Sequence, residues 1–367
     1  MSTSSRVCSL VTALSLVAAL SGCGDDDPAI ATDCGQVTPV LRCPAAARGV
    51  SIGSAVSSSA LHTDPTYSEV LARELSIVTP ENDMKWGLIH PERERYDFEA
   101  ADAIVRFAHD HGMKVRGHTL VWHQQNPGWL LDVTFGREES IAILRQHIHS
   151  VVGHFRGRIA EWDVVNEAFG DADGNRRDTL WQQRIGPDYI EIAFRFAREA
   201  DPDAKLFYND FLIERPGPKF RAVLALATDF KARGVPIDGV GFQAHVLLGT
   251  SQPLWFSNLE SNLRQIGDLG LDVAITELDV PIAPPTSDNA LAAQANIYAA
   301  ALDACLAIPR CHTFVMWGFT DRYSWIPTAY PGLDDALIFD RDYHPKPAYE
   351  ALRQRLGPVF PSSAGNM

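Results

Sequence analysis

The sequence lacks three features that would point to other classes of protein. It has no apolar run long enough to cross a bilayer, no block of basic residues, and only six cysteines in 367 residues. Its 46 acidic and 32 basic residues are interspersed and give a net charge of −14. This charge disfavours nucleic acid and anionic membrane surfaces as partners and suits an uncharged substrate.

The longest apolar stretch lies near the N-terminus, where Arg6 precedes residues 7–20. A basic residue followed by a short apolar segment is typical of an export signal rather than a membrane-spanning helix. The segment ends in Leu20-Ser21-Gly22-Cys23, which resembles the site where bacterial lipoproteins are cleaved and acylated. We predict a lipoprotein-type signal peptide over residues 1–22 and a lipid on Cys23. The chain would then be an exported cell-envelope lipoprotein whose only membrane contact is this anchor. A freely secreted protein is the alternative.

Apart from Cys8, inside the signal, and Cys23, the cysteines form two locally spaced pairs. Disulfides are the natural interpretation for an exported chain. We predict that residues 23–47 form a tether and a disulfide-closed lead-in. Metal binding is the weaker alternative because no histidine lies at ligand spacing from either pair, so we predict no metal site and no cofactor. The predicted disulfides are Cys34–Cys43 and Cys305–Cys311.

Between residues 48 and 357, short apolar runs alternate with helical patterns. Eight such runs with intervening helices predict a single α/β domain, a (β/α)8 TIM barrel, followed by a polar tail over 358–367. A doubly wound sheet is the alternative, but Ser-Ile-Gly-Ser-Ala-Val at 51–56 is not the glycine-rich turn that this fold would need. The predicted strands are Ile52–Ala55, Ile77–Thr79, Lys114–His118, Ala160–Asn166, Leu206–Asn209, Val240–Gln243, Val273–Thr276 and Thr313–Trp317. The predicted helices include Ala101–His111, Glu138–His154, Pro187–Ala200, Lys219–Arg233, Asn258–Leu269 and Asn289–Ala304.

Polar and aromatic side chains gather where the predicted strands end. In a TIM barrel these carboxyl ends meet on the face that carries the active site. The strand ends and the residues just after them supply Glu81, Asn82, Lys85, Trp86, His118, Trp122, His123, Gln125, Asn166, Glu167, Asn209, Asp210, Gln243, His245, Glu277, Asp279 and Trp317.

Two glutamates in this set, Glu167 and Glu277, end separate strands. A pair of carboxylates about 5–5.5 Å apart can hydrolyse a glycosidic bond with retention of configuration. The imidazole of His245, held in place by Asp279, would keep Glu277 ionised, which suits a nucleophile. Glu167 is expected beside Asn166, Trp162 and Trp122, a drier setting that suits a general acid.

Six motifs, in order from about residue 50 to 357, resemble glycoside hydrolase family 10, whose typical members are retaining endo-1,4-β-xylanases. They are Thr-Pro-Glu-Asn-Asp-Met-Lys-Trp (79–86), Gly-His-Thr-Leu-Val-Trp-His (117–123), Trp-Asp-Val-Val-Asn-Glu (162–167), Gly-Phe-Gln-Ala-His (241–245), Ile-Thr-Glu-Leu-Asp-Val (275–280) and Trp-Gly-Phe-Thr-Asp-Arg-Tyr-Ser-Trp (317–325).

The resemblance implies an enzyme acting on xylan, with Glu167 as acid/base and Glu277 as nucleophile. Catalytic support would come from His245, Asp279 and Asn166, the last of these well placed for the sugar 2-hydroxyl. We expect a monomer. The implied sugar-binding residues are Glu81, Asn82, Lys85, His118, Trp122, Gln125, Gln243, Trp317 and Trp325.

Other interpretations stay open. Trp122, Trp317 and Trp325 could each be core residues, although their place at strand ends favours sugar platforms. Another β-glycan could be the substrate, or the chain could be a catalytically silent polysaccharide-binding lipoprotein.

The segment after the fifth predicted strand departs from the family pattern. After strand five the family commonly has Asn-Asp-Tyr-Asn, whereas this chain has Phe211 and Leu212 after Asn-Asp, which puts specificity on the leaving-group side in doubt.

Three histidines lie on one predicted helix. His147, His149 and His154 do not share one helical face, so we expect solvated surface histidines rather than a metal site.

Overall fold

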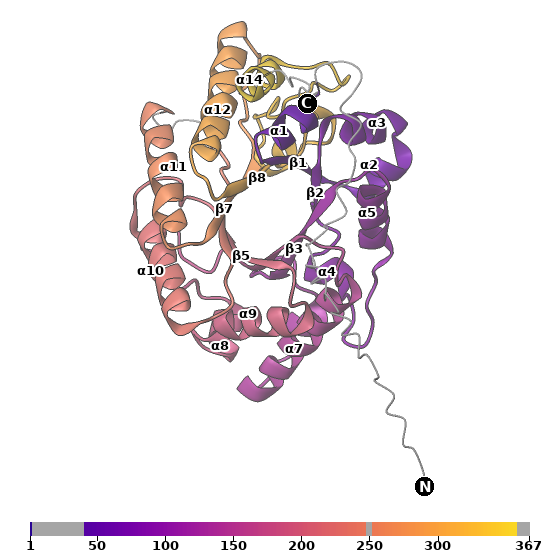
Figure 1. Cartoon of the computed structure of the whole chain (residues 1–367), viewed down its shortest axis with the longest axis vertical. Coiled ribbons are helices and arrows are strands. Elements are labelled where there is room, and N and C mark those ends of the chain that lie inside the picture. The colour runs from indigo at the N-terminus through magenta and orange to yellow at the C-terminus, as the bar shows by residue number, and fades with distance from the viewer. Residues whose placement is uncertain (2–39, 247–251, 358–367) are drawn as a thin grey trace. The chain divides into compact units, whose positions relative to one another are not determined.

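Eight parallel strands close into a barrel in which each strand pairs with the next and β8 pairs with β1. The computed structural model describes Met1 and residues 40–246 and 252–357. Figure 1 looks along the barrel and shows the helices surrounding the strands. The strands are β1 (Ser51–Val56), β2 (Ile77–Pro80), β3 (Lys114–Val121), β4 (Glu161–Asn166), β5 (Lys205–Asp210), β6 (Gly239–Phe242), β7 (Asp272–Leu278) and β8 (Cys311–Met316).

All eight predicted strands are present, and the predicted TIM barrel is confirmed. The strands are buried on both faces, as expected for a parallel sheet covered by helices. β3 extends three residues beyond the prediction because Thr119–Val121 continue the buried extended run. β4 contains a bulge, seen as a register shift between Asp163 and Val165 where β4 pairs with β5. The bulge changes which side chains of β4 face inward.

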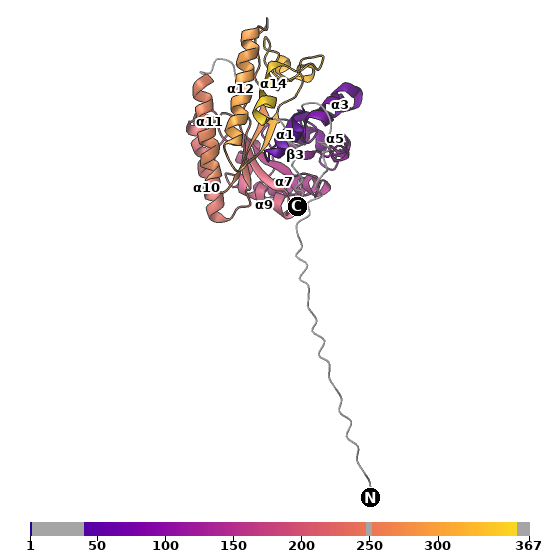
Figure 2. The ribbon, with the colours of Figure 1, turned by 45° about the horizontal axis from the view of Figure 1, so that its top comes forward.

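Helices fill the connections and form the outer layer. In Figure 2, α10, α11 and α12 run side by side, and adjacent members of this set are in contact. The six predicted helices are all present, with ends shifted by up to six residues. The helices are α1 (Arg42–Ala47), α2 (Ser58–Thr63), α3 (Pro65–Glu74), α4 (Trp86–Ile89), α5 (Glu99–Asp110), α6 (Gly128–Leu131), α7 (Arg137–His154), α8 (Leu180–Arg184), α9 (Tyr189–Ala200), α10 (Pro218–Arg233), α11 (Gln252–Gly267), α12 (Asp288–Leu306), α13 (Ile326–Ala329) and α14 (Pro347–Leu356).

The residues just before β1 pack onto the barrel. α1 contacts both β1 and α14, and α14 in turn packs along α12. The Leu41 side chain is fully buried, and its backbone N–H donates to Glu74 Oε2 at 3.2 Å. Residues 41–47, which the sequence assigns to the lead-in, therefore contribute to the same core as the strands.

The disulfide predicted between Cys305 and Cys311 is present and joins the end of α12 to the start of β8. Cys43 is also disulfide-bonded. Its predicted partner Cys34, the predicted lipidation site Cys23 and the predicted signal peptide over residues 1–22 lie outside the described residues. No helix within 40–246 or 252–357 is long and apolar enough to cross a membrane.

The prediction that His147 is a solvated surface residue is wrong. His147 is fully buried, its ring stacks on Trp86 with centroids 3.5 Å apart, and its Nδ1 lies 3.2 Å from His90 Nδ1. His147 follows Leu144 by three positions on α7 and so lies on the helix face that packs against the barrel. His149 and His154 stay partly exposed and pair with acidic residues.

Candidate active site

The carboxyl ends of the strands surround a cleft with a volume of about 530 Å³. All the predicted catalytic and sugar-binding residues except Asp279 line this cleft. The cleft is lined by Glu81, Asn82, Lys85, His118, Trp122, Gln124, Gln125, Asn166, Glu167, Phe211, Leu212, Gln243, His245, Glu277, Trp317, Trp325, Thr328, Ala329 and Tyr330.

Glu277, near the end of β7, is a buried carboxylate held on both oxygens. Its side chain accepts a hydrogen bond from Asn209 Nδ2 at 2.7 Å on Oε1, and His245 Nε2 lies 3.1 Å from Oε2. The residue is only 4 % exposed. These two contacts leave the carboxylate little rotational freedom and orient it at the cleft.

His245 lies between two carboxylates, as the sequence predicts. Its Nδ1 is 3.0 Å from Asp279 Oδ2, which also accepts from Trp325 Nε1 at 2.8 Å. Burial lowers the pKa of His245, but attraction and hydrogen bonding to Asp279 and Glu277 outweigh burial and raise this pKa well above the usual value. A protonated His245 can donate to Glu277 and to Asp279 at once.

We therefore expect His245 to remain protonated at a pH where an ordinary imidazole, with a pKa of about 6.5, is neutral. A side-chain NMR titration of the histidines would test this. Because the folded-state pKa is raised, the stabilisation from charged His245 is fully present below about pH 6.5. It is lost as the pH rises through the folded-state value. A His245 resonance that titrates at or below the ordinary value would contradict this assignment.

Glu167, which directly follows β4, accepts hydrogen bonds from neutral donors, and His123 Nδ1 lies 3.9 Å from its Oε2. Burial lowers the pKa of His123, which favours the neutral imidazole. Glu167 Oε2 accepts from Trp122 Nε1 at 2.9 Å, and its Oε1 accepts from Gln243 Nε2 at 2.9 Å and Asn166 Nδ2 at 3.1 Å. Its backbone has φ +58°, a left-handed conformation that is unusual for glutamate. Such strain is tolerated where the surrounding structure holds it, often at functional sites.

The predicted contact of Trp162 with Glu167 is wrong. Trp162 is fully buried, and its indole lies beside Gly117 and near the Phe155 ring rather than in the cleft. Trp162 lies near the start of β4, and the next residue, Asp163, contacts Arg116 and His118, so the alternation of side chains along the strand turns Trp162 to the opposite face.

Asn209, at the end of β5, contacts both Asn166 and Glu277. The sequence places it in the polar set at the strand ends but assigns it no catalytic or sugar-binding role. Its Nδ2 donates to Glu277 Oε1 and, at 2.9 Å, to Asn166 Oδ1, while its Oδ1 accepts from Thr276 Oγ1 at 2.8 Å. A Cβ at position 241 would lie 2.2 Å from Asn209 Oδ1, so Gly241 leaves the space that this side chain needs. The position of Asn209 at a strand end was the signal available in the sequence.

The ends of β2 and β3 place a cation among acidic and aromatic groups. Lys85 Nζ donates to Asn82 Oδ1 at 3.0 Å and lies 4.9 Å from the Trp122 ring centroid. Burial lowers the pKa of Lys85, whereas Glu277 and the other nearby carboxylates oppose that shift. Gln125 Nε2 also approaches Asn82 Oδ1, at 3.4 Å. This arrangement offers several donors and acceptors to hydroxyl groups.

Trp317, Trp325 and His118 form the aromatic part of the wall. The His118 ring meets the Trp317 ring edge to face at 5.1 Å, and its Nδ1 is held 3.0 Å from the buried Asp163. Trp325 contacts the His245 ring at 5.3 Å. Trp317 and Trp325 both line the cleft, where the sequence places them.

Six further residues line the cleft without having been predicted. Phe211 and Leu212 follow β5, Gln124 follows β3, and Thr328, Ala329 and Tyr330 come from the segment after β8. Loops after the strands vary in sequence more than strand ends do, so only the folded chain shows which loop residues reach the cleft. In the described part of the chain, no group of three His, Cys, Asp or Glu residues could hold a metal ion.

Comparisons with known proteins agree with this geometry. The family model "Glycosyl hydrolase family 10" matches residues 41–355. The chain is 44% identical over 318 residues to a protein of Thermotoga neapolitana named endo-1,4-beta-xylanase B, covering 86% of this chain and 90% of that protein. It is 38% identical over 303 residues to endo-1,4-beta-xylanase 1 of Humicola insolens, covering 82% and 70%.

Solved structures show the same likeness. The native xylanase 10B of Thermotoga maritima superposes with a TM-score of 0.83 at 44% identity, covering 86% of this chain and 98% of that one. The xylanase 10B of Thermotoga petrophila in complex with xylobiose gives a TM-score of 0.83 at 43% identity, covering 88% and 98%.

Proposed function

The chain belongs to glycosyl hydrolase family 10, and we propose that it is a retaining endo-1,4-β-xylanase that cleaves the backbone of xylan. The observation that carries this proposal is a pair of buried carboxylates that line one cleft and have unequal surroundings. Glu277 faces an imidazole whose pKa is raised, whereas Glu167 is contacted by neutral amide and indole donors. Two carboxyl groups in such unequal surroundings can take different roles, one as the nucleophile and the other as the general acid.

In the first step the Glu277 carboxylate attacks the anomeric carbon. Glu167 gives its proton to the glycosidic oxygen, the bond between that oxygen and the anomeric carbon breaks, and the protonated sugar chain leaves. The product is a glycosyl ester on Glu277. Asn209 and His245 hold Glu277 in place for the attack, because each contacts one of its two oxygens.

In the second step Glu167 acts as a base. It takes a proton from water, the water oxygen attacks the anomeric carbon, and Glu277 leaves as a carboxylate. Two inversions at one carbon give net retention of configuration. The chemistry is carried by side chains of this chain alone.

The walls of the cleft suit a neutral sugar chain. Amide, lysine and carboxylate groups can bond hydroxyls, and Trp317 and Trp325 offer flat apolar faces to sugar rings. Asn166 lies between Glu167, Asn209 and Gln243, a position from which it can also reach the 2-hydroxyl of the sugar being cleaved. These groups suit an uncharged polysaccharide. The acidic net charge of the chain also suits an uncharged substrate.

Product analysis on xylan, mixed-linkage glucan and cellulose tests this proposal. We expect short xylo-oligosaccharides from xylan, released first in the β configuration when the reaction is followed by NMR. Preferred cleavage of a glucan would replace xylan by another β-glycan as the substrate. Binding of all three polymers without products would favour a silent binding protein.

We also propose that the mature protein is a monomer anchored to the cell envelope through a lipid on Cys23. The support is the signal-like segment ending in Leu-Ser-Gly-Cys at residues 20–23. Metabolic labelling with a fatty acid tests the anchor. A labelled wild type and an unlabelled Cys23→Ala variant are expected, and an unlabelled wild type would leave a freely secreted enzyme.

A further inference from the structure

We propose that Lys219, on α10, is a positioning residue for the general acid Glu167. This inference rests on the proposed function, because it assumes that Glu167 protonates the leaving group. Lys219 lies 52 positions from Glu167 in the sequence and does not line the cleft. It acts through a closed set of polar contacts, the Lys219 ring, that includes the carbonyl and the N–H of the peptide between Glu167 and Ala168. The ring comprises Lys219, Asp171, Arg177, the Glu167 carbonyl, the Ala168 N–H, Tyr208 and Asp210.

Lys219 is a buried cation between two carboxylates. Its side chain is 2 % exposed, and its Nζ lies 2.7 Å from Asp210 Oδ1 and 2.9 Å from Asp171 Oδ1. The same Nζ lies 3.6 Å from the centroid of the Phe211 ring, which lines the cleft. A buried ammonium group is costly unless its partners are well placed. Through Lys219, α10 therefore forms ion pairs with both carboxylates.

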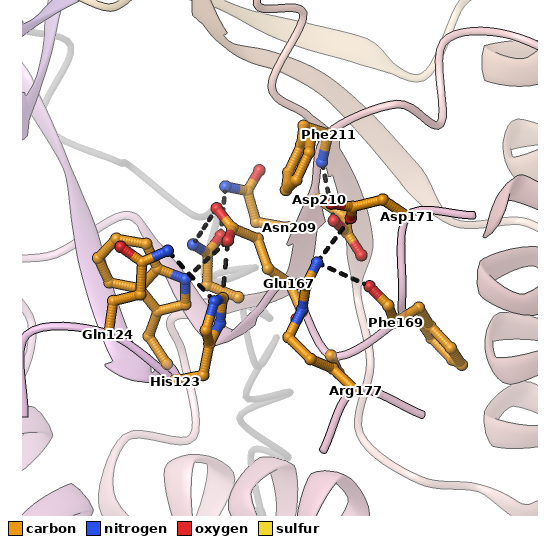
Figure 3. A network of polar contacts seen from close by, with 12 residues as sticks. His123, Gln124, Glu167, Phe169, Asp171, Arg177, Asn209, Asp210 and Phe211 are labelled. Carbon is orange, nitrogen blue, oxygen red and sulfur yellow. Dashed lines mark hydrogen bonds and ion pairs between the residues drawn. The ribbon is translucent and has the colours of Figure 1, made fainter. Parts of the chain in front are cut away.

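One arm of the ring runs through Asp171 to the carbonyl of Glu167. Asp171 Oδ1 contacts Arg177 Nη2 at 2.6 Å, and Arg177 Nε donates to the Glu167 carbonyl at 3.0 Å. Arg177 Nη2 also donates to the Phe169 carbonyl at 3.0 Å. Figure 3 shows Arg177 between Asp171 and Phe169, with Glu167 on the side facing His123. The peptide unit that follows Glu167 is thus held by a charged side chain.

The other arm runs through Asp210 to the next N–H of the chain. The Tyr208 hydroxyl donates to Asp210 Oδ2 at 2.5 Å and accepts from the Ala168 N–H at 3.0 Å. Burial raises the pKa of Asp210 to about 7, although Lys219 opposes this shift. Asp210 therefore depends on Lys219 to carry its charge near neutral pH.

The two arms meet at the peptide between Glu167 and Ala168, whose carbonyl and N–H are both held. Glu167 has the strained φ of +58°, and its own N–H donates to the Asn209 carbonyl at 2.9 Å. The direction of its side chain follows from this backbone conformation. Removing the Lys219 charge leaves Asp171 and Asp210 without their shared cation and loosens both arms. The side-chain contacts of Glu277, to Asn209 and His245, lie outside the ring.

The test compares aryl β-xylobiosides that differ in how much acid catalysis they need. A dinitrophenolate leaves without a proton, whereas a phenolate needs protonation by Glu167. For Lys219→Met, we expect kcat/KM on the phenyl substrate to fall about 10- to 100-fold and kcat/KM on the dinitrophenyl substrate to change by less than about twofold. Lys219→Arg should restore part of the loss.

Lys231→Met is the matched control, since Lys231 is exposed on the same helix, and it should keep wild-type values on both substrates. Asp171→Asn opens the ring at a side chain that is 44 % exposed, and it should show the same selectivity even if Lys219→Met does not fold. An equal fall on both substrates, or no fall on either, would overturn the proposal. A wild-type protein that cleaves neither substrate would instead refute the proposed function.

Discussion

Replacing Glu277 by glutamine is expected to reduce turnover of xylan by about 10⁵- to 10⁶-fold, the size of effect seen when a covalent nucleophile is removed. Glutamine has nearly the same shape as glutamate, and its amide oxygen can still accept from Asn209 Nδ2. It cannot form the glycosyl ester. The loss should therefore appear equally with xylan and with substrates carrying excellent leaving groups, when initial rates are measured at saturating substrate.

Two controls separate lost chemistry from lost structure. The variant should unfold in a single thermal transition and should still bind xylo-oligosaccharides, because the sugar-binding side chains are unchanged. Residual wild-type contamination must be excluded by inactivation with a mechanism-based reagent. Hydrolysis by Glu277→Gln within about tenfold of wild type would remove Glu277 from the nucleophile role.

Replacing Glu167 by glutamine is expected to have a large effect that depends on the leaving group. Hydrolysis of xylan should fall by about 10²- to 10⁴-fold, the usual contribution of general acid–base catalysis. With a dinitrophenyl xylobioside the first step needs no acid and should stay fast, while the second step loses its base and slows. A burst of dinitrophenolate should follow mixing, and intact-protein mass spectrometry should detect a sugar covalently attached to the chain.

Peptide mapping of that adduct provides the decisive check, since the sugar should be found on Glu277. An adduct on another residue would contradict the assignment of the nucleophile. The absence of a burst, with equal losses on xylan and on the activated substrate, would mean that Glu167 does not act as the acid/base. Glutamine at position 167 can keep the hydrogen bond from either Trp122 Nε1 or Gln243 Nε2, but not both, because its amide nitrogen donates and cannot accept.

Much of the fold and site could be predicted because strand ends in a TIM barrel are equivalent positions. Each apolar run of the sequence became a strand, and the polar residues that follow these runs meet at one face. The His245–Asp279 relay was predictable for the same reason, since adjacent parallel strands bring these two positions into register. This part of the site depends on local pattern and on one rule of topology.

The errors arose where contacts between elements decide the outcome. Trp162 lies near the start of β4 and packs near Phe155, on the opposite face of the strand from Asp163, and so does not reach Glu167. His147 is buried because the apolar face of α7 extends over it and a stack with Trp86 accepts an imidazole there. Asn209 was expected at the strand ends but without a role, because its role comes from contacts with side chains of two other strands.

The sequence by itself therefore determined the alternation of strands and helices, the two glutamates and most of the sugar-binding set. Hydrophobic periodicity specifies which face of an element is buried, and strand ends specify where polar groups gather. Only the tertiary structure decided how Glu167 is held, because the Lys219 ring joins β5, α10 and the segment after β4 through side chains distant in sequence. Periodicity describes one element at a time, whereas the position of a catalytic side chain depends on atoms from several elements.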